Sequence, residues 1–208
     1  MILRITNQIQ DIQEATASEP LSLEEEYENQ QSWRTSDDKL TFILCQPLLE
    51  EVTSIRAGVH DTNDKMIGDI NFFIYAHPTL DDKLIGELDV MVAEHSCRRS
   101  GIGAASCASM LSYIYRNIDK IIGEYGAAGQ DIMEIMVKIK EGNVGSRRLF
   151  KVMGFEDDGE GVNYFGEVKM LLPWEDMQKM AWFEAVKEGA KELPYENSLA
   201  TKAFPEQI

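Results

Sequence analysis

Arg98-Arg99-Ser100-Gly101-Ile102-Gly103 stands where the hydrophobic pattern of the chain changes period. Residues 84–93 before it alternate as a strand does, and apolar residues after it recur at helical spacing over residues 104–122. Glycines at such a turn accept positive φ, so successive backbone N–H groups can converge on an anion beside the positive end of the helix. The stretch therefore predicts a phosphate or pyrophosphate site, to which Arg98 and Arg99 add positive charge. The alternative is a tight turn with two solvated arginines.

The loop lacks the features of two other phosphate sites. It has no Gly-Lys-Ser/Thr, so the lysine and the metal-binding hydroxyl of a P-loop are missing. It also lacks the dinucleotide pattern Gly-x-Gly-x-x-Gly, because Ala104, Ala105 and Ser106 follow Gly103. Neither nucleotide class is therefore favoured.

Strand and helix signals alternate through the rest of the chain. Ser22 and Glu25 form a capping box that starts a first helix. The expected strands are 41–45, 66–75, 84–93, 132–139 and 165–172, and the expected helices are 22–33, 104–122, 146–153 and 174–191. This order predicts an α/β domain with a mixed sheet over residues 1–173, and a C-terminal helix with a loosely ordered tail over residues 174–208.

Composition narrows the class of partner. Of the 208 residues 44% are hydrophobic and 27% charged, as in a globular protein, and no apolar run reaches the roughly 18 residues of a membrane span. The net charge of −16 argues against nucleic acid and anionic membranes as partners and suits a cationic acceptor such as an amine; acidity for solubility explains it equally well. Met1–Ile5 is too short for the apolar core of a signal peptide, so we expect a cytoplasmic protein.

Cysteine and histidine give no sign of a metal site. Cys45, Cys97 and Cys107 are widely spaced and form no C-x-x-C pair, and three histidines are scattered along the chain. We therefore expect free thiols and no metal.

A second stretch, Asn143-Val-Gly-Ser-Arg-Arg-Leu-Phe-Lys-Val-Met-Gly-Phe155, matches a pattern Asn-x-x-(small)-x-x-Leu-Tyr/Phe-x-x-x-Gly-Phe. Together with Arg-x-x-Gly-x-Gly at 98–103, it resembles the GNAT family of N-acetyltransferases. The resemblance implies a GNAT-like mixed, mostly antiparallel sheet flanked by helices, and acetyl-coenzyme A as cosubstrate. It also implies that the amides of Arg98, Arg99, Ser100, Gly101, Ile102 and Gly103 bind the pyrophosphate, and that Asn143, Ser146 and Phe150 lie beside the pantetheine arm. Asn143 also has a simpler explanation as a helix N-cap, and both roles can hold together.

The same resemblance implies where the chemistry lies. Glu87 is fourteen positions before Gly101, the spacing of the general base in histone-type members of the family. Asp89 shares its face of the strand, and two close carboxylates raise one pKa, which suits a base near neutral pH; the alternative is two solvated acids. A backbone N–H in the stretch Met91, Val92 and Ala93 is expected to stabilise the carbonyl oxygen.

The chain departs from the family pattern at two places. Phe150 stands where many members have a Tyr that protonates the leaving thiolate, although a thiol with a pKa of about 8.5 leaves tolerably without it. Tyr164 is a candidate substitute by residue type alone. At the front, only about fifteen residues precede Thr16, so the first strand and helix of the family are expected to be missing or shortened, with Met1–Ile5 as a short strand.

Thr16–Tyr27, Ser32-Trp33 and Gly86–Arg98 resemble a cytosolic branch of the family that is connected with protein acetylation and microtubules. The resemblance implies acetyl transfer to an amino group of a protein or peptide, with tubulin among the acceptors. Two alternatives stay open. One is a catalytically weak acetyl-coenzyme A-binding module that acts through microtubule partners, and the other is an acetyltransferase of small-molecule amines.

Overall fold

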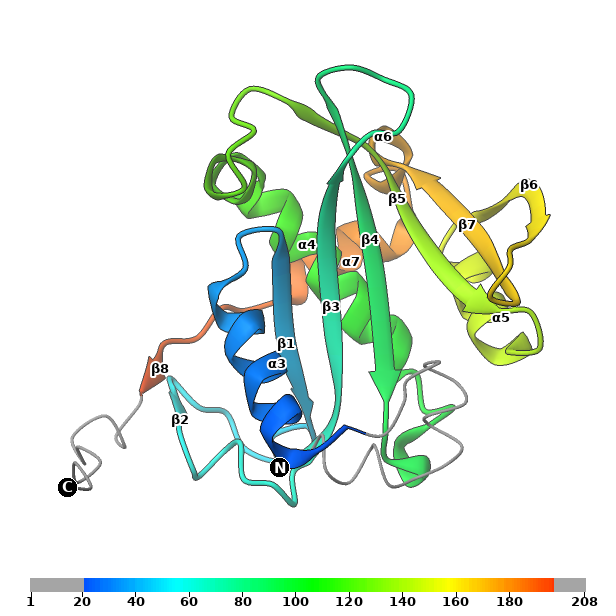
Figure 1. Cartoon of the computed structure of the whole chain (residues 1–208). Coiled ribbons are helices and arrows are strands. Elements are labelled where there is room, and N and C mark those ends of the chain that lie inside the picture. Colours follow the sequence, from blue (N-terminus) through cyan, green and yellow to red (C-terminus); the bar gives the residue numbers. More distant parts are fainter. Residues whose placement is uncertain (1–20, 197–208) are drawn as a thin grey trace.

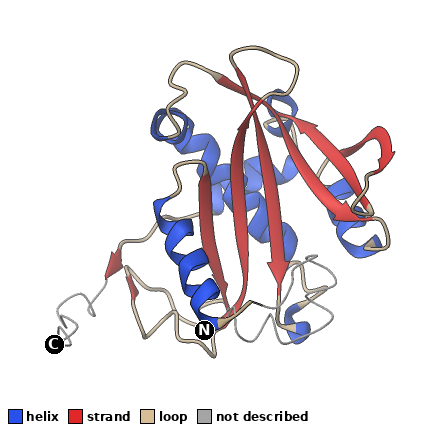
Figure 2. Ribbon diagram, in the orientation of Figure 1, coloured by secondary structure: helices blue, strands red, loops and turns tan. Residues whose placement is uncertain are grey.

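The structure is a computed structural model that describes residues 21–196. In this part of the chain, strands form a six-stranded mixed sheet in the order β1-β3-β4-β5-β7-β6, and a two-stranded parallel pair, β2 and β8 (Figures 1 and 2). The strands are β1 Lys39–Cys45, β2 Ile55–Arg56, β3 Met66–Ala76, β4 Lys83–Val92, β5 Asp131–Lys140, β6 Glu156–Val162, β7 Glu167–Pro173 and β8 Tyr195–Glu196. The expected mixed, mostly antiparallel sheet is confirmed, because only β4 and β5 run parallel within the large sheet.

Helices cover the large sheet on both faces. Figure 1 shows α3 in front of β1, with α4 and α7 behind the sheet and α5 beside β5. The helices are α3 Leu23–Thr35, η1 His95–Cys97, α4 Ile102–Glu124, α5 Val144–Val152, α6 Trp174–Met177 and α7 Ala181–Gly189. The predicted capping box of α3 is present, with Ser22 accepting from the N–H of Glu25. Among the described helices none is long and apolar enough to cross a membrane.

The hydrophobic core lies between the sheet and α4. Even-numbered residues of β3 and β4 point toward α4, and Phe72 and Leu88 are accordingly buried. Leu111 and Ile114 of α4 belong to the same buried cluster. Gly86 makes room for this packing, because a Cβ there would lie 2.3 Å from Cζ of Phe72. Odd-numbered residues therefore lie on the opposite face, which we call the open face of the sheet.

The strands β4 and β5 pair along only half of their length. Their parallel register runs from Lys83 opposite Asp131 to Glu87 opposite Met136 and ends there, while β4 continues to Val92 in register with β3. Figure 1 shows the two strands diverging beyond this point. We call the resulting gap the β4–β5 opening.

Most predicted elements are confirmed. The short elements β2 and η1 were not predicted, and the C-terminal part of the chain differs in three places. The expected helix over 174–191 is two helices, because the chain is extended at Met180, whose side chain packs against Gly154. Strand β6 was not predicted, since its sequence has no apolar alternation and its pairing with β7 holds it in place. Of the tail that was predicted to be loosely ordered beyond Pro194, Tyr195–Glu196 form β8 beside β2, and residues 197–208 lie outside the described residues.

Two other expectations have a different outcome. The strand expected at Met1–Ile5 lies outside the described residues. The division of the chain at residue 173 stays a prediction; Met177 of α6 and Phe183 of α7 are buried in the same core as the sheet.

Candidate active site

The end of β4 presents one backbone N–H to the β4–β5 opening. The N–H of Ala93 donates to the carbonyl of Ile67 on the β3 side at 2.8 Å. Because N–H and C=O of one residue point to the same side and successive residues alternate, the peptide groups of Val92 point away from β3. The carbonyl of Val92 accepts from Nε of Arg98 at 2.8 Å, on that other side. The N–H of Val92 thus faces the opening, whereas that of Ala93 is used within the sheet.

The glycine loop follows directly and joins β4 to α4. Gly101 has φ +89°, in the left-handed region that favours glycine, and a Cβ there would meet nothing within 4 Å. Arg99 is also left-handed, with φ +60°. Within the described part of the chain, no side chain caps the N-terminus of α4 and no acidic residue lies in its first turn. The free N–H groups and the positive end of a 23-residue helix therefore remain available to an anion, as a pyrophosphate site requires.

Arg98 and Ser100 hold this loop in shape. The guanidinium of Arg98 donates to the carbonyls of Val92 at 2.8 Å and of Ala93 at 3.4 Å, which ties the loop to the end of β4. Ser100 donates its hydroxyl to the carbonyl of Cys97 at 2.6 Å. Of the two arginines, Arg98 is thus engaged with the backbone.

The two sequence motifs meet in space. A Cβ on Gly103 would lie 3.1 Å from Cδ1 of Leu149, so the missing side chain lets the start of α4 approach α5. Asn143 is the N-cap of α5 and its Oδ1 accepts from the N–H of Ser146 at 3.1 Å. The N-cap explanation of Asn143 is therefore confirmed, while its contact with coenzyme A stays a prediction.

The two aromatic candidates lie in different surroundings. Phe150 is buried and packs edge-to-face against Phe155 at 5.1 Å between ring centroids, so its ring belongs to the core. Tyr164 is 97% exposed, on the turn between β6 and β7. Neither arrangement brings a phenol to the β4–β5 opening, since Phe150 has no hydroxyl and Tyr164 points to solvent.

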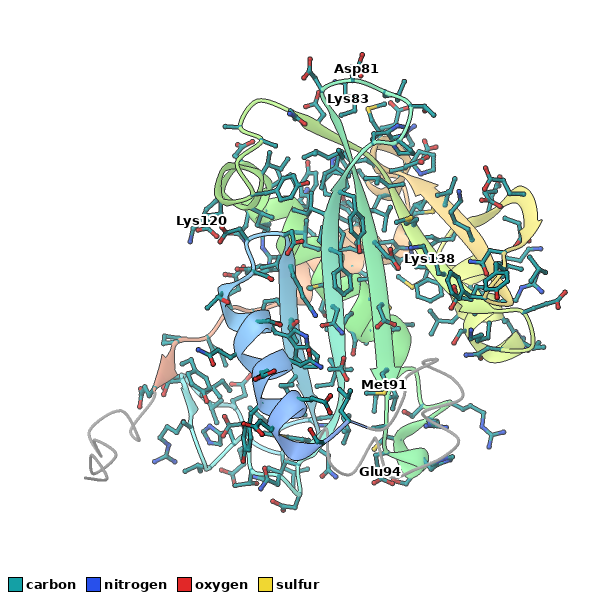
Figure 3. All side chains as sticks on the ribbon, in the orientation of Figure 1. Asp81, Lys83, Met91, Glu94, Lys120 and Lys138 are labelled. Carbon is teal, nitrogen blue, oxygen red and sulfur yellow. The ribbon has the colours of Figure 1, made fainter. Side chains whose placement is uncertain are left out.

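The open face carries the two predicted carboxylates. Glu87 binds Nζ of Lys138 on β5 at 2.8 Å; Figure 3 shows Lys138 beside these strands and Met91 near the end of β4. The side chain of Asp89 is exposed to solvent, yet the surrounding protein partly desolvates its carboxyl. This desolvation first, and the charge of Glu87 second, raise the pKa of Asp89 above its ordinary value. The predicted direction of the shift is thus present at Asp89.

Further polar residues of the open face were missed from the sequence. Asp69 and Asn71 of β3 stand opposite Met91 and Asp89. Nδ2 of Asn71 donates to Oδ2 of Asp69 at 2.7 Å, and the hydroxyl of Thr41 on β1 donates to Oδ1 of Asn71 at 2.7 Å. The signal for them was two polar residues alternating inside the otherwise apolar strand 66–75.

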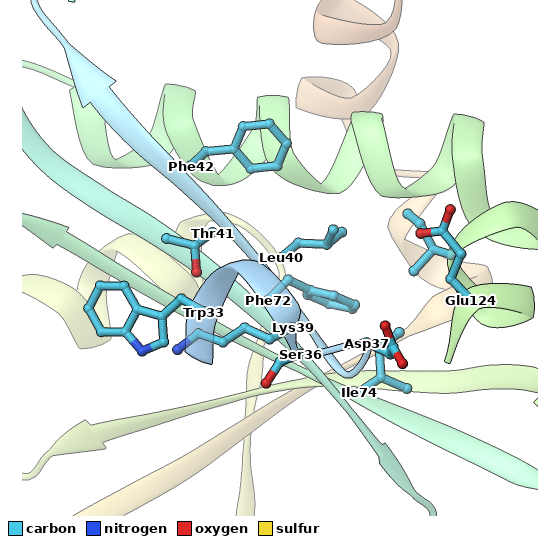
Figure 4. Close-up of a pocket in the computed structure, with 11 residues that line it drawn as sticks. Trp33, Ser36, Asp37, Lys39, Leu40, Thr41, Phe42, Phe72, Ile74 and Glu124 are labelled. Atoms are coloured by element: carbon cyan, nitrogen blue, oxygen red, sulfur yellow. The ribbon is translucent and has the colours of Figure 1, made fainter. Parts of the chain in front are cut away.

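Lys39 borders this group at the edge of the sheet. Its Nζ lies 4.4 Å from the ring centroid of Trp33 and 4.8 Å from that of Phe73. Figure 4 shows Lys39 and Trp33 side by side in a pocket at the edge of the sheet, which Phe42 and Glu124 also line. In the described sheet β1 is the edge strand farther from β5, so this pocket is separate from the β4–β5 opening.

Over residues 21–196, no group of three or more His, Cys, Asp or Glu side chains is positioned to hold a metal ion. The thiols of Cys45, Cys97 and Cys107 are free.

Comparisons with known proteins place the chain beside acetyltransferases. A family model described as an acetyltransferase (GNAT) domain matches residues 3–156. An N-acetyltransferase 9-like protein of Dictyostelium discoideum is 37% identical over 172 residues, which cover 81% of this chain and 74% of the relative. The human alpha/beta-tubulin-N-acetyltransferase 9 is 33% identical over 191 residues, which cover 92% of this chain and 82% of the relative.

A solved structure has the same fold at low identity. An aminoglycoside acetyltransferase in complex with coenzyme A superposes with a TM-score of 0.58 at 14% identity, covering 86% of this chain and 91% of that one. At this identity the likeness bears on the fold alone.

Proposed function

This chain belongs to the GNAT family of acetyltransferases, and from that premise we propose that it moves the acetyl group of acetyl-coenzyme A to an amino group of a protein or peptide. The prediction of an acetyl-coenzyme A-dependent N-acetyltransferase is confirmed at the level of the family. The acceptor and the roles of individual residues are our proposals.

One observation carries the proposal most directly. The uncapped N-terminus of α4, preceded by the left-handed Gly101, lies at the end of the strand whose far half separates from β5. Backbone donors for a diphosphate and an opening in the sheet thus follow one another along the chain. We assign the pyrophosphate of coenzyme A to the loop from Arg98 to Gly103, and the pantetheine arm to the opening, with Asn143 and Ser146 at its side.

Acetyl transfer needs a donor for the carbonyl oxygen as charge develops on it. Of the predicted stretch from Met91 to Ala93, we assign this role to the N–H of Val92, because the Ala93 amide donates to Ile67. A preorganised backbone donor of this kind contributes on the order of a hundredfold or more to the rate.

The amine must lose a proton and the thiolate must leave. We assign proton removal to the carboxylates of the open face, with Glu87 and Asp89 as the candidates on β4. Lys138 binds the carboxylate of Glu87 at 2.8 Å, whereas burial raises the pKa of Asp89, so we assign proton removal to Asp89 before Glu87. With Phe150 in the core, we expect the thiolate to leave without a tyrosine acid, which its pKa of about 8.5 permits.

The acceptor is proposed from the named relatives and from charge. The human relative carries alpha/beta-tubulin in its name, and the net charge of −16 suits a cationic amine. We therefore place tubulin N-terminal peptides first among the acceptors, and the cytoplasm as the compartment of action.

The test is a transfer assay with three classes of acceptor. Full-length protein is incubated with acetyl-coenzyme A and with tubulin N-terminal peptides, an unrelated peptide library, or polyamines and aminoglycosides, and acetylated products are identified by mass spectrometry. We expect transfer to peptides above that to the small amines. Binding of acetyl-coenzyme A without transfer to any peptide would contradict the proposal, and transfer to small amines alone would reassign the acceptor.

A further inference from the structure

Asp69 is a third carboxylate on the open face, on the strand next to Asp89. In the register of β3 and β4, Asp69 lies opposite Met91 and Asn71 lies opposite Asp89. Asp69 and Asp89 are therefore diagonal neighbours on the same face, which places their β-carbons roughly 7 Å apart. At this separation the charge of Asp89 acts on the carboxyl of Asp69.

Asp69 is held by two hydrogen bonds in series. Thr41 donates to Oδ1 of Asn71 at 2.7 Å, and Nδ2 of Asn71 donates to Oδ2 of Asp69 at 2.7 Å. Asn71 is only 7% exposed, so its amide has a fixed direction. Because Thr41 occupies the amide oxygen, the amide N–H groups face Asp69 and orient its carboxylate.

The register also sets Asp69 beside the separated half of β4. Glu87 is the last residue of β4 that pairs with β5, and Lys138 binds it at 2.8 Å. Met91, opposite Asp69, lies beyond this point, next to Val92. Asp69 therefore lies beside the part of β4 that borders the β4–β5 opening, whereas Glu87 lies where that opening begins.

We propose that Asp69 and Asp89 act together as a two-carboxylate base for the acceptor amine, with Asn71 and Thr41 as positioning residues. The inference rests on the acetyl transfer proposed above.

The charges around Asp69 favour this role. Burial first and the charge of Asp89 second raise the pKa of Asp69 to about 6, while Asn71 and Lys39 of β1 act in the opposite direction. Asp38 lies near Lys39, and Glu87 and its partner Lys138 lie beyond Asp89. A carboxylate with this pKa is deprotonated at neutral pH, yet binds a proton more strongly than a solvated aspartate does.

The proton balance of the step is complete. The protonated amine gives one proton to the carboxylate pair, from which it passes to solvent. The nitrogen lone pair forms the C–N bond at the acetyl carbon, the C–S bond breaks, and its electron pair leaves on sulfur. The second proton that nitrogen loses ends on the thiolate, so the products are the amide, the free thiol and one proton.

The test measures kcat, KM and the pH profile of kcat for the full-length chain with its best acceptor. Asp69→Asn is expected to lower kcat on the order of a hundredfold and to remove the acidic limb near pH 6, with the affinity for acetyl-coenzyme A unchanged. Asp89→Asn is expected to shift the limb to lower pH, because a charge that raises the pKa of Asp69 is lost. Thr41→Val is expected to lower kcat with little change in KM. Asp81→Asn, the same change at an exposed turn residue, is the matched control.

Two results would overturn the inference, and they are distinguishable. An active wild type whose kcat and acidic limb survive Asp69→Asn contradicts the two-carboxylate base alone. A wild type that transfers acetyl to no amine contradicts the proposed function and, with it, this inference. Thermal unfolding of each variant shows whether a loss of activity comes from unfolding or from loss of the base. A kcat of Thr41→Val equal to that of wild type would contradict the positioning role.

Discussion

The two sides of the candidate site are built in different ways. The proposed cofactor side is one contiguous stretch, Arg98 to Gly103, in which backbone N–H groups are the proposed donors and the glycines are visible in the sequence. The proposed acceptor side is assembled from single residues of β1, β3, β4 and β5, which only the register of the strands brings together. A backbone anion site at a turn can therefore be recognised from its glycines in the sequence, whereas a group of side chains from several strands cannot be recognised until the strand register is known.

This contrast predicts that the two sides can be disabled separately. Changes in the loop should weaken binding of acetyl-coenzyme A, and changes on the open face should slow the reaction while binding persists.

The largest effect is expected for Gly101→Asp. An aspartate is strained at φ +89° and places a negative charge where the diphosphate is proposed to bind, so affinity for acetyl-coenzyme A should fall about 100-fold or more. Calorimetric titration measures this loss. Gly123→Asp, which adds the same charge near the other end of α4 where a Cβ meets nothing within 4 Å, should bind as the wild type does.

Gly68→Ala should disturb the packing of β3 against the end of β4, where the proposed acceptor side meets the proposed cofactor side. A Cβ on Gly68 would lie 1.9 Å from the carbonyl oxygen of Met91, so β3 and the end of β4 must move apart. We expect the free energy of unfolding to fall by about 2 kcal/mol, as overpacked sites do. Urea denaturation measures it, with Gly123→Ala as the unstrained control; equal stability of the two variants would contradict the close approach.

Asp69→Asn should make the protein more stable near neutral pH while it slows the reaction. The folded-state pKa of Asp69, about 6, lies above the ordinary 3.8, so the folded state binds more protons between these values. In the wild type, stability is therefore lost as pH rises from about 3.8 to 6, a loss that the variant does not have. We expect the variant to gain about 1 kcal/mol at neutral pH and nothing below about pH 4. Chemical denaturation at both pH values, with Asp81→Asn as control, checks the sign; a variant less stable at neutral pH would contradict it.

The smallest effect is expected for Lys39→Met. The charge of Lys39 lowers the pKa of Asp69, so its removal should move the acidic limb of kcat to higher pH by a fraction of a unit. Loss of the contacts with Trp33 and Phe73 should cost about 0.5–1 kcal/mol in the docking of α3 on β1. The pH profile and amide exchange of α3 measure the two effects. Lys120→Met, on an exposed side chain of α4, is the control, and a limb that moves to lower pH would contradict the electrostatic argument.

The sequence was sufficient for the elements that contain their own signals. Periodicity predicted β3, β4 and α4, and the capping box at Ser22 predicted the start of α3. It was not sufficient for β6 or for the break at Met180, because pairing with β7 and packing against Gly154 decide them. Tertiary contacts of this kind override local propensity.

The same limit applies to the site. We could predict Glu87, Asp89 and the glycine loop as candidates because all of them lie in one short segment of the chain, where their spacing can be counted. Lys138 and Thr41 could not, since 51 residues separate Lys138 from Glu87 and 30 separate Thr41 from Asn71. Ala93 was one of three predicted backbone donors, and only its hydrogen bond to Ile67 distinguishes it from Val92.

The central claim is that cofactor binding belongs to the loop and proton removal to the open face. Titration of acetyl-coenzyme A into wild type, Gly101→Asp and Asp69→Asn, side by side, tests it most directly. We predict equal Kd values for wild type and Asp69→Asn and a Kd raised about 100-fold or more for Gly101→Asp. Wild-type affinity in Gly101→Asp, or a loss of binding in Asp69→Asn, would contradict the account.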